Sequence, residues 1–109
     1  MATFDEFTVL DIRAGTVVSA AVLEGARRPA YKLEVDLGPE FGIKQSSAQI
    51  TELYTPQALI GCQVLAVVNF PVKLIAGFRS EILVLGVYTD DGVVLIKPER
   101  SVEPGAKLG

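Results

Sequence analysis

Short apolar runs rich in valine, isoleucine and leucine recur along this chain, and their length is the strongest constraint on its fold. The runs at 64–68 and 82–87 have the length and composition of buried strands. They are far shorter than the roughly 20 apolar residues that cross a membrane as a helix. Half of the 109 residues are hydrophobic, without any low-complexity tract, so we expect one globular domain over residues 1–109.

The segment 69–86 begins where the first of these runs ends and finishes inside the second. It mixes polar and charged side chains with aromatic ones, and it contains Pro71, which removes a ladder donor, and Gly77, which permits a turn. Side chains of this kind, held between rigid strands, commonly form binding surfaces. An ordinary surface connection with two packed side chains, Phe70 and Phe78, fits the same pattern.

The first half of the chain predicts a short helix, a long strand and a hairpin. Thr3 and Glu6 have capping-box spacing, which favours a helix through Phe7. A β-rich run at 12–23 follows, and Gly15 within it suggests a bulge or bend. Strict alternation at 31–37 predicts a half-buried strand that pairs across a turn at 38–42 with a strand at 43–50. If Ile43 and Ile50 are buried, alternate members of the polar run between them project outward.

The second half predicts one helical turn and three further strand segments. Thr55 is the expected cap, Pro56 the first helical position and Gly61 the stop. Strands at 62–68 and 80–88 follow, and the turn at 90–92 leads into a last strand at 93–96. Five strands with a helix between the third and fourth predict an all-β, five-stranded OB-fold barrel with short terminal extensions. An SH3-like barrel or a small sandwich fits the strand count but explains the placed helix less well.

Catalytic and metal-binding chemistry is poorly supplied. The chain has no histidine, no P-loop and a single cysteine, Cys62, which we expect to be a small core hydrophobe. The carboxylates Glu34, Asp36, Asp90 and Asp91 are interpreted as solvated charge. The sequence therefore predicts no catalytic residue, metal or cofactor, and a Ser–Lys pair formed by Ser46 and Lys44 is the residual enzymatic alternative.

Binding chemistry is better represented. The polar run Lys44–Gln49 (KQSSAQ) lies on a predicted strand, where alternate side chains can meet phosphate oxygens or base edges, although a hydrophilic strand face with a buried serine is an equal alternative. Arg27, Arg28 and Lys32 should lie nearby through the hairpin. The formal net charge of −3 argues against non-specific nucleic-acid binding, but residues 13–33 carry a local net charge of +3.

Four stretches together resemble the CsaA family of the tRNA-binding-domain superfamily: FTVLDIRAGTVVSA, ARRPAYKLEVDLG, GIKQSSAQIT and VNFPVKLIAGFRSEILVLG. The superfamily includes the C-terminal domain of some methionyl-tRNA synthetases. The resemblance implies an OB-fold homodimer, a tRNA-binding-type domain and an export-related chaperone role toward unfolded polypeptides, in contact with the secretion machinery. The RNA-binding positions expected from the resemblance and from the cationic pattern are Arg27, Arg28, Lys32, Lys44, Ser46, Gln49, Asn69, Lys73, Arg79, Ser80 and Glu81.

Two further expectations concern client binding and assembly. Phe70 and Phe78 are expected to line a groove for apolar peptides. Apolar side chains in the terminal segments exceed what a small barrel can enclose, so a two-fold homodimer is expected to bury them. The residues predicted at this interface are Phe4, Phe7, Leu10, Val102 and Leu108. The N-terminus lacks the basic start of a secretory signal and the single cysteine cannot form an intrachain disulfide, so a cytoplasmic location without membrane insertion is expected.

Overall fold

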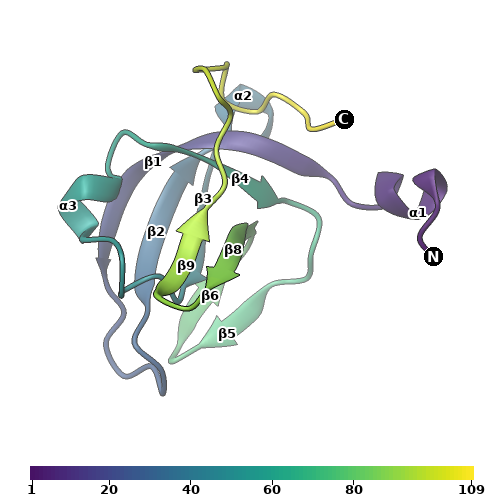
Figure 1. Ribbon diagram of the computed structural model, residues 1–109. Helices are drawn as coiled ribbons and strands as arrows, with labels where there is room; N and C mark the ends of the chain where they lie inside the picture. The colour runs from purple at the N-terminus through teal and green to yellow at the C-terminus, as the bar shows by residue number, and fades with distance from the viewer.

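The computed structural model describes residues 1–109 and consists of a curled antiparallel sheet with two small hairpins and three short helices (Figure 1). The main sheet has the strand order β3-β2-β1-β4-β7 and forms a nearly closed five-stranded barrel, which confirms the predicted OB-fold. Its strands are β1 (Ile12–Val22), β2 (Tyr31–Asp36), β3 (Ile43–Ala48), β4 (Gln63–Val67) and β7 (Leu83–Val84). The hairpins are β5 (Lys73–Ile75) with β6 (Phe78–Ser80), and β8 (Gly86–Thr89) with β9 (Gly92–Leu95).

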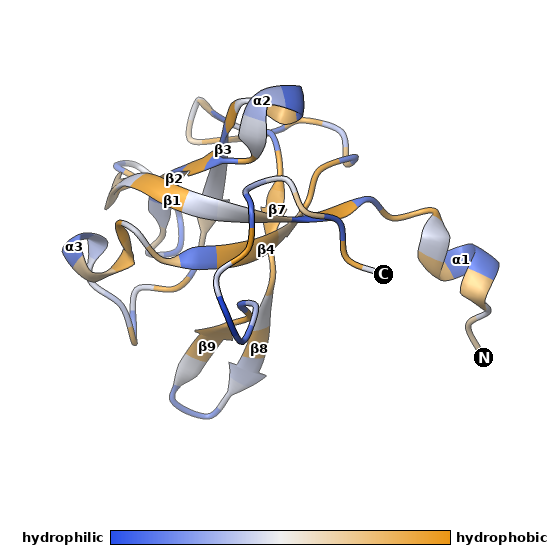
Figure 2. Ribbon diagram, turned by 90° about the horizontal axis from the view of Figure 1, so that it is seen from above, coloured by the Kyte–Doolittle hydropathy of each residue, from blue (hydrophilic) through white to orange (hydrophobic).

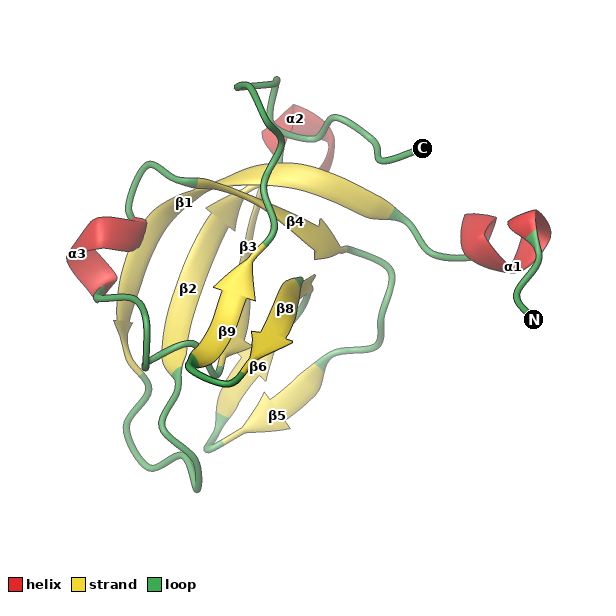
Figure 3. Cartoon of the chain, in the orientation of Figure 1, coloured by secondary structure: helices red, strands yellow, loops and turns green.

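The three helices occupy the ends and connections of the barrel (Figure 3). They are α1 (Phe4–Thr8), α2 (Gly38–Phe41) and α3 (Pro56–Leu59). The Thr3 side chain accepts from the Glu6 amide and the Glu6 side chain accepts from the Thr3 amide, so the predicted capping box is present. None of these helices has the length and apolar character required to cross a membrane.

The core follows from the alternation of β2. Tyr31, Leu33 and Val35 are all buried, while Lys32 and Glu34 between them are exposed, as the period of two predicts. Side chains from β1, β4 and α3 pack against this face, among them Val17, Val64 and Leu59. The Thr55 hydroxyl accepts from the Ala58 amide at the start of α3, and this cap presents Leu59 to the core.

Gly15 does not form the bulge that its position in a strand suggested. It pairs regularly with Val64, and the irregularity of β1 lies between Val17 and Ser19 instead. A Cβ at residue 15 would stand 2.5 Å from Val35 Cγ1 and 2.8 Å from Leu37 Cδ2. Glycine is therefore required at this position because the opposite wall of the barrel approaches the backbone closely.

The segment 69–86 contains a hairpin that the sequence did not predict. Ala76 (φ 51°) and Gly77 (φ 77°) form a two-residue turn with positive φ at both positions, the geometry that matches strand twist in hairpins. The strand expected at 80–88 is divided into β7 and β8, whereas the predicted turn at Asp90 and Asp91 does close the β8–β9 hairpin.

The predicted burial of Cys62 is wrong, and of the two isoleucines that flank the polar run only Ile50 is buried. Cys62 is exposed, because Gly61 (φ 90°) turns the chain after α3 and β4 begins only at Gln63; the thiol lies 3.3 Å from the Ala58 carbonyl oxygen. Ile43 is 57% exposed, since it opposes Asp36 on the outer face of the hairpin. Cys62 and Ile43 each lie at a strand end, where the period of two is not yet established.

The C-terminal segment lies along the first half of β1. Ala14 donates its amide to the Ala106 carbonyl and accepts from the Gly105 amide, and Leu108 donates to Ile12. The Arg13 side chain donates to the Gly105 carbonyl and to Asp11, and the hydrogen bond to Asp11 raises the pKa of the guanidinium. The C-terminus is thereby placed on the side of the barrel from which α1 projects (Figures 1 and 2).

Candidate binding cleft

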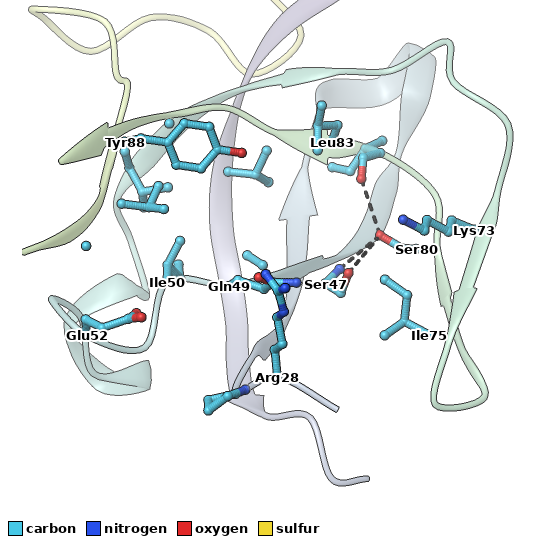
Figure 4. A pocket seen from close by; sticks show the side chains of 18 of the residues that line it. Arg28, Ser47, Gln49, Ile50, Glu52, Lys73, Ile75, Ser80, Leu83 and Tyr88 are labelled. Carbon is cyan, nitrogen blue, oxygen red and sulfur yellow. Dashed lines mark hydrogen bonds between the residues drawn. The ribbon is translucent and has the colours of Figure 1, made fainter. Parts of the chain in front are cut away.

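A cleft of about 840 Å³ opens where the barrel is least completely closed, between β3, the β5–β6 hairpin and the β8–β9 hairpin (Figure 4). Its lining mixes polar and apolar side chains, and the apolar ones include Ile50, Ile82, Val84, Val93 and Leu95. Phe70, Pro71 and Ile75 continue this apolar surface toward β5, and Tyr88 stands at the rim with 91% of its surface exposed. The volume lies within the range typical of ligand-binding pockets.

Side chains complete the barrel wall beside the cleft where backbone pairing stops. Glu81 donates its amide to the Gln45 carbonyl, and Gln45 donates its own amide to Glu81 Oε1 at 3.0 Å. The Ser47 amide donates to Ser80 Oγ at 3.0 Å, as Figure 4 shows. These side-chain oxygens take the place of strand carbonyls, because an amide beside the core needs an acceptor. We call this junction of β3 with residues 79–81 the seam.

The charges of the cleft are divided between its walls. Glu52, Asp90 and Asp91 line the wall formed by the β8–β9 turn, and the turn packs on Glu52, since a Cβ at Gly92 would lie 2.9 Å from Glu52 Cβ. Lys73 lies on the β5 side, and Arg28 extends between the two walls (Figure 4). The ion pairs in the structure, Arg13–Asp11 and Arg100–Glu99, involve none of these groups. With Glu81, four carboxylates and two cations line the cleft.

One edge of β8 is not used by the fold. Because antiparallel hydrogen bonds alternate, the bond from Ile96 to Leu85 and the two-residue turn after Thr89 direct Val87 and Thr89 toward β9. The backbone groups of Gly86 and Tyr88 therefore point away from β9. Both residues line the cleft, so the free backbone edge borders it.

The structure brings some predicted site residues into the cleft and assigns others to different places. Cleft-lining residues among them are Arg28, Gln49, Phe70, Lys73, Ser80 and Glu81. Arg27, Lys32 and Arg79 are exposed outside the lining, and Lys44 is half-buried. Asn69 joins two segments, since its amide group donates to the Val9 carbonyl and accepts from the Asp11 amide. Phe78 is half-buried but does not line the cleft, so the expected groove forms around Phe70 alone.

Ser46 corrects the expectation most clearly. It opposes Leu33, is fully buried, and donates its hydroxyl to the Ser47 carbonyl. A ligand cannot reach this side chain without opening the barrel, so Ser46 belongs to neither an RNA contact nor a Ser–Lys nucleophile pair. The alternative of a buried, hydrogen-bonded serine is the one that the structure shows.

A second, smaller groove of about 290 Å³ lies between α1 and the C-terminal segment. Phe4, Phe7 and Leu10 line it together with Leu108, which unites four of the five residues predicted at a dimer interface. The Phe4 and Phe7 rings are 6.3 Å apart, and α1 has no buried residue of its own. Val102 lies outside this groove, because Gln63 holds its backbone amide and carbonyl.

The acidic wall of the cleft was not anticipated from the sequence. Asp90 and Asp91 form the predicted turn, and the sequence around Glu52 carries no motif that indicates a site. Nothing in the local sequence indicates that residues 52 and 90–91 meet, because their proximity depends on how the β8–β9 hairpin folds back over the loop before α3.

Comparisons with known proteins agree with the fold. The chain is 53% identical to the chaperone CsaA from Bacillus anthracis, with a TM-score of 0.93 over all of this chain and 99% of that one. It is 47% identical to the CsaA chaperone protein of Picrophilus torridus, with a TM-score of 0.95 over the full length of both. It is 40% identical over 104 residues to the methionine–tRNA ligase of Methanococcoides burtonii, covering 94% of this chain.

The chain spans about 15% of the length of the ligases it matches, so it corresponds to one part of them. The family described as "Putative tRNA binding domain" matches residues 12–107, which is nearly all of the barrel and the C-terminal segment. This family is a binding domain and not a catalytic one. The chain therefore belongs to the tRNA-binding domain family and, within it, resembles the CsaA proteins.

Proposed function

We propose that this protein is a chaperone-like binding protein that holds extended polypeptide segments in the cleft between β3, β5–β6 and β8–β9. The observation that carries the proposal is a cleft with apolar side chains on its floor and a free strand edge at its border. Such an edge binds any extended chain through backbone hydrogen bonds, and apolar pockets accept varied side chains. The resemblance to solved CsaA chaperones supports it. Action on export-bound clients in the cytoplasm, with transfer to a secretion machinery, belongs to the same proposal.

The proposal is tested with a client that aggregates on refolding. We expect the protein, at stoichiometric concentration, to suppress light scattering by the client, and Phe70→Asp in the cleft to weaken this effect. Val18→Asp is the matched control, because Val18 is exposed to the same degree (42% against 43%) but lies on β1 away from the cleft. Absence of suppression, or equal loss in both folded variants, would contradict the proposed site.

Structured RNA of the tRNA class is the second candidate ligand, favoured by the family and by a row of residues that crosses four strands. Lys32 opposes Ser47, the Ser47 amide bonds Ser80, and Ser80 opposes Lys73. Lys32 and Lys73, exposed at the two ends of this row, suit a phosphate backbone, while the buried Ser80 hydroxyl between them serves the Ser47 amide. The wall formed by Glu52, Asp90 and Asp91 repels phosphate, so RNA would keep to the opposite side of the cleft, where Lys73 and Arg28 lie, and to the exposed cations Arg27 and Arg79.

Salt dependence tests the RNA proposal. Each phosphate contact should lower the slope of log affinity against log salt by roughly 0.7 to 0.9, so a few contacts per subunit give a steep decline. We expect Lys73→Glu to weaken tRNA binding and flatten the slope, and Arg100→Glu, on the exposed segment after β9, to have a smaller effect. Undetectable binding at low salt would refute the proposal, and equal effects of the two variants would exclude this surface.

A further inference from the structure

We propose that the cleft prefers extended segments in which a lysine or arginine neighbours apolar side chains. The segment is added as a strand on the free edge of β8, with its basic side chain at the wall formed by Glu52, Asp90 and Asp91. This inference rests on the proposed polypeptide-binding function and specifies the class of segment that is bound.

The free edge fixes the conformation of the ligand. Gly86 and Tyr88 offer their amides and carbonyls to the cleft, and a chain that pairs with them must be extended. The missing side chain of Gly86 serves the contact with β9, because a Cβ there would meet Val93 Cγ1, and leaves the outward amide and carbonyl of residue 86 unaffected. Successive side chains of an added strand alternate between two faces, so every second one points to the apolar floor around Ile82 and Val84.

The charge distribution fixes the chemistry at one end of the segment. Glu52, Asp90 and Asp91 gather where β8 ends in its turn, and none of them forms an ion pair within the chain. A strand running along β8 passes this wall as it leaves the apolar floor. A basic side chain at that point meets uncompensated negative charge, whereas an acidic one is repelled.

Other occupants fit this wall less well. Four carboxylates against two cations give the cleft lining a formal charge of −2, which opposes the entry of a phosphate backbone. No three histidine, cysteine, aspartate or glutamate side chains are grouped so that they could hold a metal ion. A polypeptide with a basic residue beside apolar ones satisfies the floor, the edge and the acidic wall together.

Peptide affinities test the charge preference directly. Three fluorescent ten-residue peptides share an alternating valine–serine core and carry lysine, glutamine or glutamate at both ends of that core. We expect the lysine peptide to bind about two- to five-fold more tightly than the glutamine peptide at low salt, as one or two exposed ion pairs allow, and the glutamate peptide to bind more weakly than both.

The acidic wall is tested by the triple variant E52Q/D90N/D91N, in which the order of the three peptides should collapse. The control E34Q/E99Q/E103Q removes the same charge from exposed positions outside the cleft and should preserve the order. The preference is refuted if all three peptides bind the unmodified protein equally, or if both triple variants change the order alike.

Pairing on the free edge of β8 is tested separately with Tyr88→Pro. This variant removes the backbone amide of residue 88, which points away from β9, and so breaks no hydrogen bond of the β8–β9 hairpin. Tyr88→Val keeps the amide and is the control for the lost ring. We expect only the proline variant to lose affinity for all three peptides, and equal affinities of the two variants would refute pairing on β8. If no peptide binds the unmodified protein, the proposed polypeptide-binding function fails as well; if peptides bind without regard to charge, that function stands and only the preference fails.

Discussion

At the scale of single residues, several polar side chains of this chain act as replacements for missing backbone partners. Ser80 and Glu81 accept from strand amides at the seam, and Gln63 and Asn69 each hold a neighbouring segment with both ends of an amide group. Such groups are needed because strands of this small barrel stop before their neighbours do. Residues that resemble a ligand-binding motif in the sequence therefore include some whose role in the structure is to close the barrel.

Ser80 gives the sharpest test of this interpretation. Ser80→Ala leaves the Ser47 amide without its acceptor beside the core, and we expect it to lower the free energy of unfolding by about 1–3 kcal/mol. Ser47→Ala is the control, because it removes only a side-chain contact of 3.5 Å and keeps the amide bond to Ser80. Urea denaturation measures both variants. A Ser80→Ala protein as stable as Ser47→Ala would show that the seam does not depend on this hydroxyl.

The residue scale also shows why site prediction from the sequence was incomplete. Arg28, Gln49, Phe70 and Lys73 line the cleft as their residue types suggested. Ser46 does not, because burial of one serine in KQSSAQ depends on which face of β3 meets Leu33, and the period of two alone does not fix that choice. The acidic wall depends on contacts between distant segments, which no local pattern contains.

At the scale of elements, long strands with clear alternation were predictable and short ones were not. β2 follows its pattern, and α3 has Thr55 as its cap and Pro56 as its first position, although it ends at Leu59, two residues before the expected stop at Gly61. β5 and β6 are three residues each, too short to show a period, and the break between β7 and β8 leaves no local signal. These short strands are stabilised by pairing with their neighbours, and β6 and β7 also contact β3. Both are tertiary effects that the local sequence does not show.

The C-terminal segment is attached to the barrel partly through the Gln63 side chain, and this attachment can be tested. Gln63 on β4 donates to the Val102 carbonyl at 2.8 Å and accepts from the Val102 amide at 3.0 Å. We expect Gln63→Ala to speed hydrogen exchange at Val102, because the opened segment loses both bonds, and to cost about 1 kcal/mol of global stability. Amides of β2 exchange only on global unfolding, so their protection against exchange should fall by no more than the loss of global stability.

Thr16→Val is the comparison for this test, since the Thr16 hydroxyl accepts from the same Gln63 amide group at 3.3 Å but forms no hydrogen bond with the C-terminal segment. Unchanged exchange at Val102 in Gln63→Ala would mean that the bonds between Ala14 and residues 105–106 hold the segment without help.

At the scale of the whole molecule, two apolar recesses remain on the surface, and their linings share no residue. The cleft adjoins the two hairpins. The smaller groove between α1 and the C-terminal segment, lined by Phe4, Phe7, Leu10 and Leu108, is called the terminal groove. A helix of five residues without a buried side chain is not stable alone and needs a surface to pack on. The barrel supplies only part of that surface, so the two recesses point to two different kinds of contact, one with ligands and one that orders α1.

We predict that a second copy of the chain covers the terminal groove and forms a two-fold homodimer. Phe4 is 76% exposed and Phe7 39%, which is unfavourable for apolar rings on a monomer, and a self-complementary contact buries both on each subunit. Phe4→Asp should therefore shift sedimentation toward the monomer, while Val22→Asp, at an exposed apolar position outside the groove, should not. Deletion of residues 1–7 should have the same effect as Phe4→Asp. A protein that sediments as a monomer at high micromolar concentration contradicts the prediction, and a dimer that survives the deletion undiminished excludes α1 from the interface.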